Sequence, residues 1–278
     1  MRIAAVNWEL EPGDDVSFVR HLERIVEEAV RGRADVVVLP ECIDLECLGQ
    51  VPELPIPEVA SFLSSTFDVR ANAIRQLSQA HMITIIGGSM IVAEGSQYLN
   101  RCVVAENGQV SYQDKLVMTQ FEQNEWGLTA GRGLTKLHDS RLGVTICYDS
   151  EFPASSRVLA EAGVLCQAVP AFTESRFGYQ RVRWSCQARA IEHQIYVVHT
   201  SLVGSLRQEP VPMTYGTSAI LTPSIEGFPE DSILAETDLN RPGIAIADLD
   251  FDLLLKSREI GDVRNWHDRD RGDWRLNS

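Results

Sequence analysis

The sequence predicts an α/β fold in which two β-sheets are covered by outer helices. At both ends of the chain, short apolar runs alternate with segments of helical spacing, and a hairpin signal interrupts this order in the middle. No internal repeat of constant period and no low-complexity linker divides the 278 residues. We therefore expect one domain over residues 1–261 and a polar tail over 262–278.

The first elements form the pattern of a β-α-β unit. Residues 2–7 are an apolar run typical of a buried strand, and residues 15–31 carry apolar side chains at helical spacing behind the acidic cap Asp14. A second strand is expected over 35–39, before Pro40. Such a crossover normally makes its two strands parallel.

The middle of the chain is expected to be antiparallel. A helix over 69–81 leads into a strand over 82–86 that closes at Gly87, and two short strands flank Asn107 and Gly108, a strong hairpin signal. Alternation of strands and helices then resumes. The later elements are a strand over 142–147, a helix over 152–162, a strand over 164–169, a helix over 178–193, and strands over 194–200, 217–221 and 243–248.

Charge and cysteine patterns narrow the functional classes. Twenty-five Lys and Arg against 39 Asp and Glu give a net charge of −14 without a basic cluster, which disfavours nucleic-acid binding. No window reaches the ~20 apolar residues of a membrane span, and the N-terminus lacks the pattern of a signal peptide. The six cysteines form no C-x-x-C pair and several lie in apolar runs, so a cytoplasmic protein is expected.

Three reactive side chains follow predicted strands, where α/β proteins place their chemistry. Glu41 follows VVVLP, Lys115 follows the hairpin, and Cys147 ends LGVTIC. A thiol becomes nucleophilic when a base takes its proton, and an ammonium group with the Tyr148 N–H could hold an oxyanion. Attack on an amide or nitrile carbon would give an acyl-enzyme. The alternative is an inert core thiol, a solvated lysine and a loop carboxylate.

Several motifs resemble those of the nitrilase superfamily of carbon–nitrogen hydrolases. They are LPE at 39–41, DKLVMTQFE at 114–122 and GVTICYDSEFP at 143–153, followed by RVLAEAG and QARAIEHQIYVV. The resemblance runs in order from residue 2 to about residue 260. It implies a four-layer α-β-β-α sandwich without metal or organic cofactor, paired into at least a homodimer. The tail over 262–278 is expected to pack at that oligomer interface.

The resemblance also implies the roles of individual residues. Position by position, the family's base falls on Glu41, its lysine on Lys115 and its nucleophile on Cys147. The family has a second glutamate that positions substrate and water, and two residues could fill this place. Glu122 continues the lysine motif, whereas Glu125 precedes a Trp-Gly pair in an expected lid, so Glu122 is preferred. The alternative is that both are exposed loop acids.

The residues after the nucleophile bear on the bond that is cleaved. Sequences resembling true nitrilases usually carry Cys-Trp-Glu, and amidases more often carry Cys-Tyr-Asp, as here at Cys147, Tyr148 and Asp149. We therefore expect a hydrolase that cleaves linear amides of small molecules and releases ammonia or an amine. A nitrilase that converts a nitrile to a carboxylic acid, and a thiol-dependent acyltransferase, are the alternatives.

Glu151 bears on the charge of the substrate. Family members that act on dicarboxylic amides often have an arginine at this position, and Glu151 would repel a substrate carboxylate. A neutral or cationic amide is therefore favoured, unless Arg176, Arg181 or Arg183 reaches the mouth of the site.

Aromatic residues near the proposed site are candidate pocket walls, because ligand sites are largely apolar. Phe121, Trp126, Phe172 and Tyr179 lie in segments close to the reactive residues. Ordinary core packing is the alternative for each. With Tyr148 and Glu151, the first three complete the expected substrate-binding set.

Overall fold

The computed structural model describes residues 1–51 and 53–273. Its strands are β1 (Arg2–Glu9), β2 (Val36–Val38), β3 (Thr84–Glu94), β4 (Gln97–Glu106), β5 (Gln109–Asp114), β6 (Leu142–Val144), β7 (Cys166–Ala171), β8 (Tyr196–Val203), β9 (Ala219–Leu221), β10 (Ile233–Glu236) and β11 (Gly243–Asp248). Its helices are α1 (Asp15–Arg31), α2 (Ile56–Ser64), α3 (Phe67–His81), α4 (Gln120–Asn124), α5 (Pro153–Glu161), α6 (Arg176–His193), α7 (Phe251–Ile260) and α8 (Asn265–Asp268), with the 3₁₀ segments η1 (Ile43–Gln50) and η2 (Cys147–Glu151).

The strands form two halves of one bent sheet. The first half contains β11 and β1 to β5, and the second contains β6 to β10. A short parallel pairing of Asn7–Glu9 in β1 with Ser201–Val203 in β8 joins the halves. The two sheets expected from the sequence are thus joined into one continuous hydrogen-bonded sheet, because β1 extends beyond residue 7 and pairs with β8.

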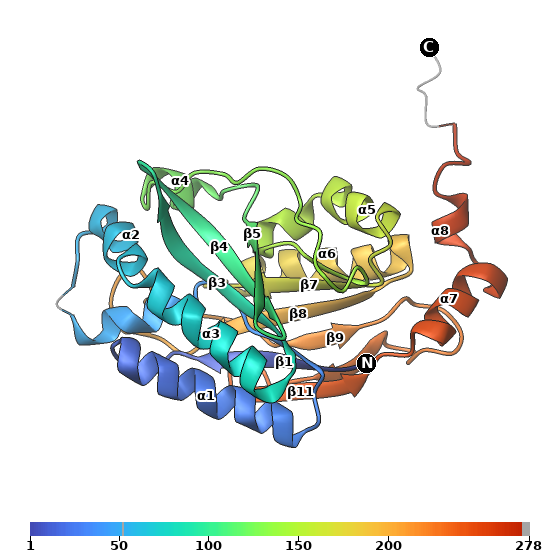
Figure 1. Cartoon of the computed structure of the whole chain (residues 1–278). Coiled ribbons are helices and arrows are strands. Elements are labelled where there is room, and N and C mark those ends of the chain that lie inside the picture. The colour runs from blue at the N-terminus through green and yellow to red at the C-terminus, as the bar shows by residue number, and fades with distance from the viewer. Residues whose placement is uncertain (52, 274–278) are drawn as a thin grey trace, which may run out of the picture.

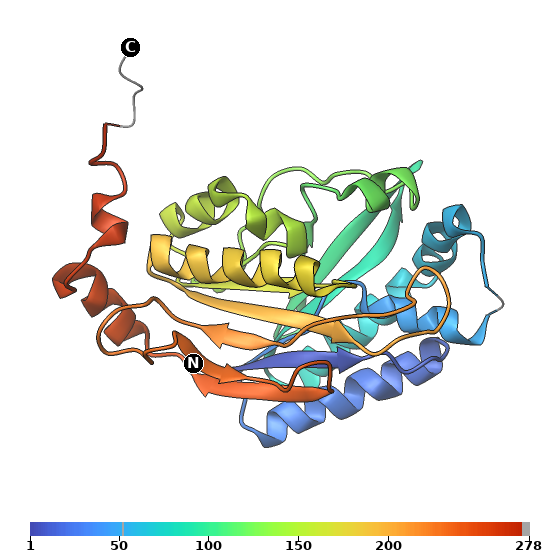
Figure 2. The same cartoon turned by 180° about the vertical axis from the view of Figure 1, so that it is seen from behind.

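Alternation of side chains along β1 explains the layers. Ala4 and Val6 pack in one apolar core with residues of α1, while Ile3 and Ala5 pack in a second core with residues of β7 and β8. Helices α1 and α3 lie on one side of the strands, and α5 and α6 lie on the opposite side (Figures 1 and 2). The predicted α-β-β-α layering is therefore confirmed.

The predicted end of the third strand was wrong. The strand does not close at Gly87 but continues to Glu94 through a bulge. Gly88 has a φ of 66°, and a Cβ atom there would lie 2.0 Å from the carbonyl oxygen of Pro40. Glycine therefore lets β3 pass close to the turn that carries Glu41.

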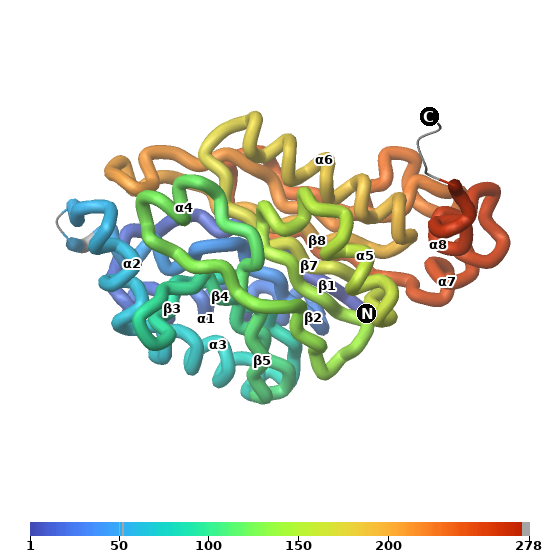
Figure 3. The backbone as a smooth tube through the Cα atoms, turned by 90° about the horizontal axis from the view of Figure 1, so that it is seen from above, coloured from blue at the N-terminus to red at the C-terminus, as the bar shows by residue number. Residues whose placement is uncertain are grey.

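The described part of the C-terminal tail packs on its own chain. Helices α7 and α8 lie at one end of the molecule, and α8 contacts α6 (Figure 3). The guanidinium groups of Arg258 and Arg269 lie 4.6 and 3.9 Å from the ring centroid of Trp266, whose backbone N–H donates to Gln194. Residues 274–278 of the expected tail lie outside the described residues. Within the described residues, no helix combines the length and apolar character needed to cross a membrane.

Candidate active site

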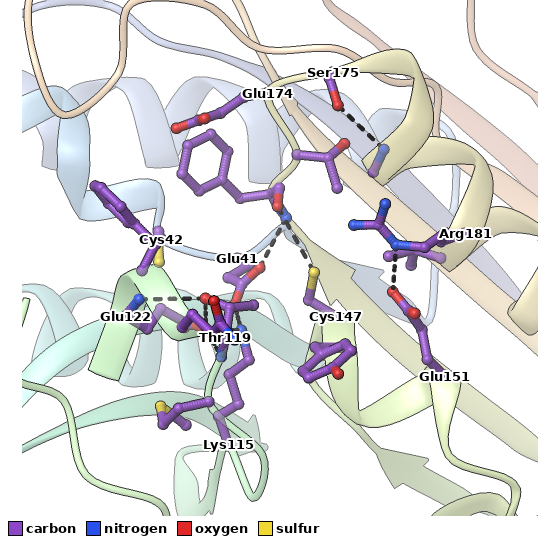
Figure 4. Close-up of a pocket in the computed structure, with 18 of the residues that line it drawn as sticks. Glu41, Cys42, Lys115, Thr119, Glu122, Cys147, Glu151, Glu174, Ser175 and Arg181 are labelled. Atoms are coloured by element: carbon purple, nitrogen blue, oxygen red, sulfur yellow. Dashed lines mark hydrogen bonds and ion pairs between the residues drawn. The ribbon is translucent and has the colours of Figure 1, made fainter. Parts of the chain in front are cut away.

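A cavity of about 610 Å³ lies beyond the ends of the central strands (Figure 4). It is bordered by the turn after β2, by α4, by η2 and by the start of α6. Of the residues expected from the sequence to act in catalysis or to form pocket walls, all but Tyr179 line it: Glu41, Lys115, Phe121, Glu122, Trp126, Cys147, Tyr148, Glu151 and Phe172. Residues from four separate segments of the chain therefore meet at one cavity.

Lys115 lies at the centre of a buried ion-pair network. Its Nζ donates to Glu41 Oε1 at 2.8 Å, and to Glu122 Oε1 and Oε2 at 2.8 and 2.7 Å. An ammonium group has three protons, so these contacts satisfy it completely. Figure 4 shows Cys147 and Glu122 on either side of Glu41.

The two carboxylate oxygens of Glu41 differ in their partners. Oε1 accepts from Lys115 and also from Asn100 Nδ2 at 2.9 Å, whereas Oε2 accepts from the backbone N–H of Phe172 at 2.9 Å. The Cys147 thiol also interacts with this carboxylate. Because two donors occupy Oε1, the free lone pair that could take a proton lies on Oε2. Asn100 was not predicted as a site residue, because its only signal is a polar side chain within the strand segment YLNRCVV.

Asn100 also links the two glutamates. Its Nδ2 donates to Glu122 Oε1 at 3.1 Å as well as to Glu41, and its side chain is fully buried in β4. The two protons of one amide group thus hold both carboxylates in a fixed relation to each other.

Cys147 lies on a turn and not in the strand that was predicted to reach it. Strand β6 ends at Val144, and Cys147 begins η2 with a φ of 46°, a left-handed conformation that costs ~1–3 kcal/mol in residues other than glycine. Ser150 Oγ donates to the Cys147 carbonyl oxygen at 2.7 Å. This turn brings the thiol to the wall of the cavity, with Sγ 3.7 Å from the Phe172 carbonyl oxygen.

Asp149 ties the cysteine turn to the lysine segment, a role that sequence analysis missed. Its buried carboxylate accepts backbone N–H bonds from Leu116 at 3.1 Å and from Val117 at 2.8 Å. It also accepts from the Ile146 N–H at 3.3 Å. Burial raises the pKa of Asp149 to about 6, although these backbone donors oppose the shift. The carboxylate therefore fixes Lys115 relative to Cys147.

Glu122 belongs to the cavity and Glu125 does not. Thr119 and Glu122 form a capping box at the start of α4, in which Thr119 donates through its backbone N–H at 2.9 Å and its Oγ1 at 2.8 Å to Glu122 Oε2. Glu125 ends the same short helix and is exposed. The capping bonds and Lys115 together aim the Glu122 carboxylate into the site.

Burial and charge set the protonation of these groups. Burial raises the pKa of Glu41, although Lys115 opposes the shift. Burial, and then the charge of Glu41, raise the pKa of the Cys147 thiol well above its usual value. Burial would lower the pKa of Lys115, but the two carboxylates raise it well above its usual value. For Glu122, burial is outweighed mainly by Lys115, so its pKa is lowered.

The resting site at neutral pH thus contains a neutral thiol beside a charged lysine. A nucleophilic thiolate must form during attack, with Glu41 as the nearby proton acceptor. Among the described residues, no group of three or more His, Cys, Asp or Glu side chains could hold a metal ion.

Of the three arginines considered from the sequence, only Arg181 lines the cavity. Its Nε lies 3.7 Å from Glu151 Oε1. Arg183 instead lies 2.9 Å from Glu236, and Arg176 is not part of the lining. The outer part of the cavity therefore has an acidic and a basic group in contact.

The aromatic residues divide between the cavity and the core. Phe121 and Trp126 both line the cavity, with ring centroids 5.7 Å apart in an edge-to-face arrangement. Tyr179 was expected as a further wall, but it is absent from the lining. It packs against the His199 ring and hydrogen-bonds to Thr217.

The fold is a layered α/β sandwich, and a cysteine, a lysine and two glutamates meet beyond its strand ends. This combination is typical of carbon–nitrogen hydrolases. The chain belongs to the carbon-nitrogen hydrolase family, whose model matches residues 2–258. The resemblance found in the sequence motifs is therefore confirmed.

Relatives with similar sequences are named as hydrolases and amidases. The chain is 32% identical to the probable hydrolase YhcX of Bacillus subtilis, over 98% of this chain and 54% of that protein. The chain thus spans about half the length of YhcX. It is 26% identical to the deaminated glutathione amidase of Synechocystis, over 87% of this chain and 89% of that protein.

Solved structures share the fold. Saccharomyces cerevisiae Nit3, a member of branch 10 of the nitrilase superfamily, matches with a TM-score of 0.77 and 21% identity over 93% of each chain. A mutant amidase from Nesterenkonia sp. AN1, with acrylamide added at its active-site cysteine, matches with a TM-score of 0.73. Its identity is 22%, over 93% of this chain and 97% of that chain.

Proposed function

We propose that this protein is an amidase that hydrolyses the carbon–nitrogen bond of a small linear amide through a cysteine acyl-enzyme. The observation that carries the proposal is the buried Lys115, which is hydrogen-bonded to both Glu41 and Glu122 in a cavity lined by Cys147. A buried lysine between two carboxylates is costly to maintain, and its ammonium group is suited to stabilise an oxyanion in the adjacent cavity when one of its two contacts with Glu122 is given up.

The first half-reaction forms a thioester. Cys147 Sγ attacks the amide carbon while its proton passes to Glu41 Oε2, the carboxylate oxygen that has a free lone pair. The Lys115 ammonium and the Tyr148 N–H stabilise the oxyanion of the tetrahedral intermediate. Glu41 then returns the proton to the leaving nitrogen, so the carbon–nitrogen bond breaks and ammonia or an amine departs.

The second half-reaction uses water. Glu41 takes a proton from a water molecule that Glu122 orients, and the hydroxide attacks the thioester carbon. Collapse of this intermediate returns the thiolate, which takes its proton back from Glu41. The balance is one amide and one water converted to one carboxylic acid and one ammonia or amine.

An amide is proposed over a nitrile because amidases are prominent among the named relatives and because Cys-Tyr-Asp follows the amidase pattern. A nitrilase, and a thiol-dependent acyltransferase in which another acceptor replaces water, are the competing candidates.

Ammonia release from a panel of amides and nitriles tests this function. We expect release from amides that depends on Cys147, and its loss in Cys147→Ala with the fold unchanged by circular dichroism. Glu122→Gln should lose most of the activity, whereas Glu125→Gln should retain it. Full turnover by Cys147→Ala would overturn the mechanism, and release from nitriles alone would favour the nitrilase.

We also propose a homodimer formed through the outer helical face. Phe177, Trp184 and Ile191 are spaced seven residues apart on α6 and are exposed, as is Val158 on the adjacent α5. An apolar stripe of this kind on one helix face is typical of an interface. The tail over 262–278 would border this interface, since α8 contacts α6. Sedimentation should give a dimer that Trp184→Glu dissociates.

The remaining proposals concern organisation and location. We propose that residues 1–261 form the catalytic domain, because the lining of the cavity lies entirely within them. A cytoplasmic location is proposed because all six cysteines are free, buried thiols, as expected in a reducing compartment. Fractionation of cells that express the tagged full-length protein tests the location.

A further inference from the structure

The charges that line the cavity do not balance. Four carboxylates and two cations belong to the lining: Glu41, Glu122, Glu151 and Glu174 against Lys115 and Arg181. Lys115 is ion-paired with the two inner glutamates, and Arg181 lies next to Glu151. In the ranges 1–51 and 53–273, no cation is paired with Glu174. The outer cavity therefore carries an uncompensated negative charge.

Glu174 also lies near a second acid. It is on the loop before α6, at the edge of the cavity in Figure 4. Partial burial, and then the charge of Glu209 on the loop after β8, raise the pKa of Glu174. Two neighbouring carboxylates without a cation form a site that a positively charged ligand group would stabilise.

The apolar part of the lining has a matching chemistry. Phe121, Trp126, Tyr148 and Phe172 give the cavity aromatic walls. Aromatic faces attract alkylammonium groups and have no such attraction for carboxylates. Aromatic walls and an unpaired carboxylate therefore favour the same ligand charge, although they are independent features.

We propose that the substrate is an amide whose far end carries an ammonium group, and that Glu174 is the residue that binds this group. This inference rests on the proposed amidase function, since it assumes that the amide end reaches Cys147. It assigns Glu174 as a specificity-determining residue.

Arg181 could in principle bind an anionic substrate instead, but its surroundings oppose this. The Glu151 side chain is only 17% exposed, and Arg181 is its cationic neighbour. Moving Arg181 to a substrate carboxylate would leave Glu151 without this neighbour in a largely buried position, which is unfavourable. An anion would also approach Glu174 and Glu209.

Three substrates of matched length test the charge preference. ε-Aminocaproamide, heptanamide and pimelic acid monoamide share a chain of methylene groups and differ in an ammonium, methyl or carboxylate end. We expect the cationic amide to have a kcat/KM at least about tenfold above that of the neutral one, as a charged hydrogen bond allows, and the anionic amide to have the lowest. Equal values, or preference for the anion, would overturn the proposal.

Two variants test whether Glu174 causes this charge preference. Glu174→Gln keeps the shape of the side chain and removes its charge, so the ratio of cationic to neutral kcat/KM should fall about tenfold. Glu23→Gln, on the exposed face of α1 away from the cavity, should leave the ratio unchanged. An unchanged ratio in Glu174→Gln would assign the preference to another group and overturn the role of Glu174.

A binding measurement separates this proposal from the amidase function. Pentylammonium should slow alkylation of Cys147 by iodoacetamide, followed by mass spectrometry, and pentanoate should not. The protection should weaken in Glu174→Gln. Protection without ammonia release from any amide would count against the amidase function alone, whereas ammonia release without protection by pentylammonium would count against the cationic substrate.

Discussion

The inner and outer parts of the cavity are built differently. In the inner part, the side chains of Lys115, Glu41 and Glu122 are 2, 3 and 9% exposed, and each is held by several hydrogen bonds. In the outer part, Arg181 is 62% exposed and, within the described part of the chain, has one ionic neighbour, Glu151, at 3.7 Å. The side chains proposed to carry out the chemistry are thus rigidly positioned, whereas those proposed to select the substrate are less constrained by their neighbours.

The difference also concerns electrostatic cost. Charges in the inner part have been removed from water, so each partner is needed to stabilise the others. In the outer part, Arg181 remains largely solvated, so its long contact with Glu151 contributes little to folding. Substitutions in the inner part should therefore affect stability and turnover together, and those in the outer part mainly selectivity.

The largest effect is expected from Lys115→Met. This change keeps the length of the side chain but leaves two buried carboxylates without their cation, which should lower the free energy of unfolding by about 3–5 kcal/mol and abolish turnover. The pKa of Glu41 is already raised by burial, and the loss of Lys115 would raise it further. The destabilisation should therefore shrink as the pH falls and the carboxylates become protonated. Urea unfolding at several pH values measures this destabilisation. A decrease in the free energy of unfolding of less than about 1 kcal/mol at neutral pH would contradict the proposed difference between the inner and outer parts.

Asp149→Asn should have the next largest effect. The amide would place one NH₂ group against the backbone N–H donors that the carboxylate now accepts, at a cost of about 1–3 kcal/mol. The resulting shift of Cys147 relative to Lys115 should lower kcat by about 100-fold.

The same variant has a characteristic dependence on pH. The pKa of Asp149 is raised from 3.8 to about 6, so the folded state holds this proton more tightly than the unfolded chain does. This group therefore makes the native protein lose stability as the pH rises from about 4 to about 6. Asp149→Asn should lose that part of the pH dependence, and the exposed control Asp262→Asn should keep it. An identical pH dependence in both variants would contradict the assignment.

Much of the inner site could be predicted from the sequence. Glu41 follows a strand with a strong apolar signal, Lys115 follows the predicted hairpin, and the motif order identified the family. Asn100 and Asp149 could not be predicted, because their roles depend on which backbone and carboxylate groups tertiary structure brings to them. The strained turn at Cys147 was likewise invisible, since an apolar run does not reveal where β6 ends.

The elements that were missed share a physical cause. Helix α4 has five residues, too few for periodicity, and is fixed mainly by the capping bonds of Thr119. Helix α2 follows Pro55 and has Pro57 in its first turn, and prolines in a sequence indicate a loop as readily as a helix start. Strand β10 is short and only half-buried. Of these three elements, α4 alone borders the cavity. The charges of the outer cavity lie on η2, on the loop before α6 and on α6, so their balance depends on tertiary contacts that the sequence does not show.

Asn100→Leu should have a smaller effect that identifies a positioning role. The change removes the hydrogen bonds to Glu41 and Glu122 but keeps the branched shape of the side chain. Because these bonds stabilise the carboxylate form, the pKa of Glu41 should rise, and the acidic limb of the kcat/KM profile should move to higher pH. We expect kcat to fall about tenfold at neutral pH, with partial recovery at higher pH. A fall of the same size at every pH would indicate a purely structural role.

The smallest effect is expected from Arg181→Gln in the outer cavity. Since Arg181 is well exposed, the free energy of unfolding should change by less than about 1 kcal/mol. Among the described residues, this change removes the one cation of the outer lining, so Glu151 and Glu174 would both be available to an ammonium group. The preference for ε-aminocaproamide over heptanamide should therefore rise a few-fold, while Arg176→Gln, which lies outside the lining, should not alter it. A reduced preference would mean that Arg181 helps to hold Glu151 in the geometry that binds the cation, and selection would then depend on a fixed ion pair as the inner site does.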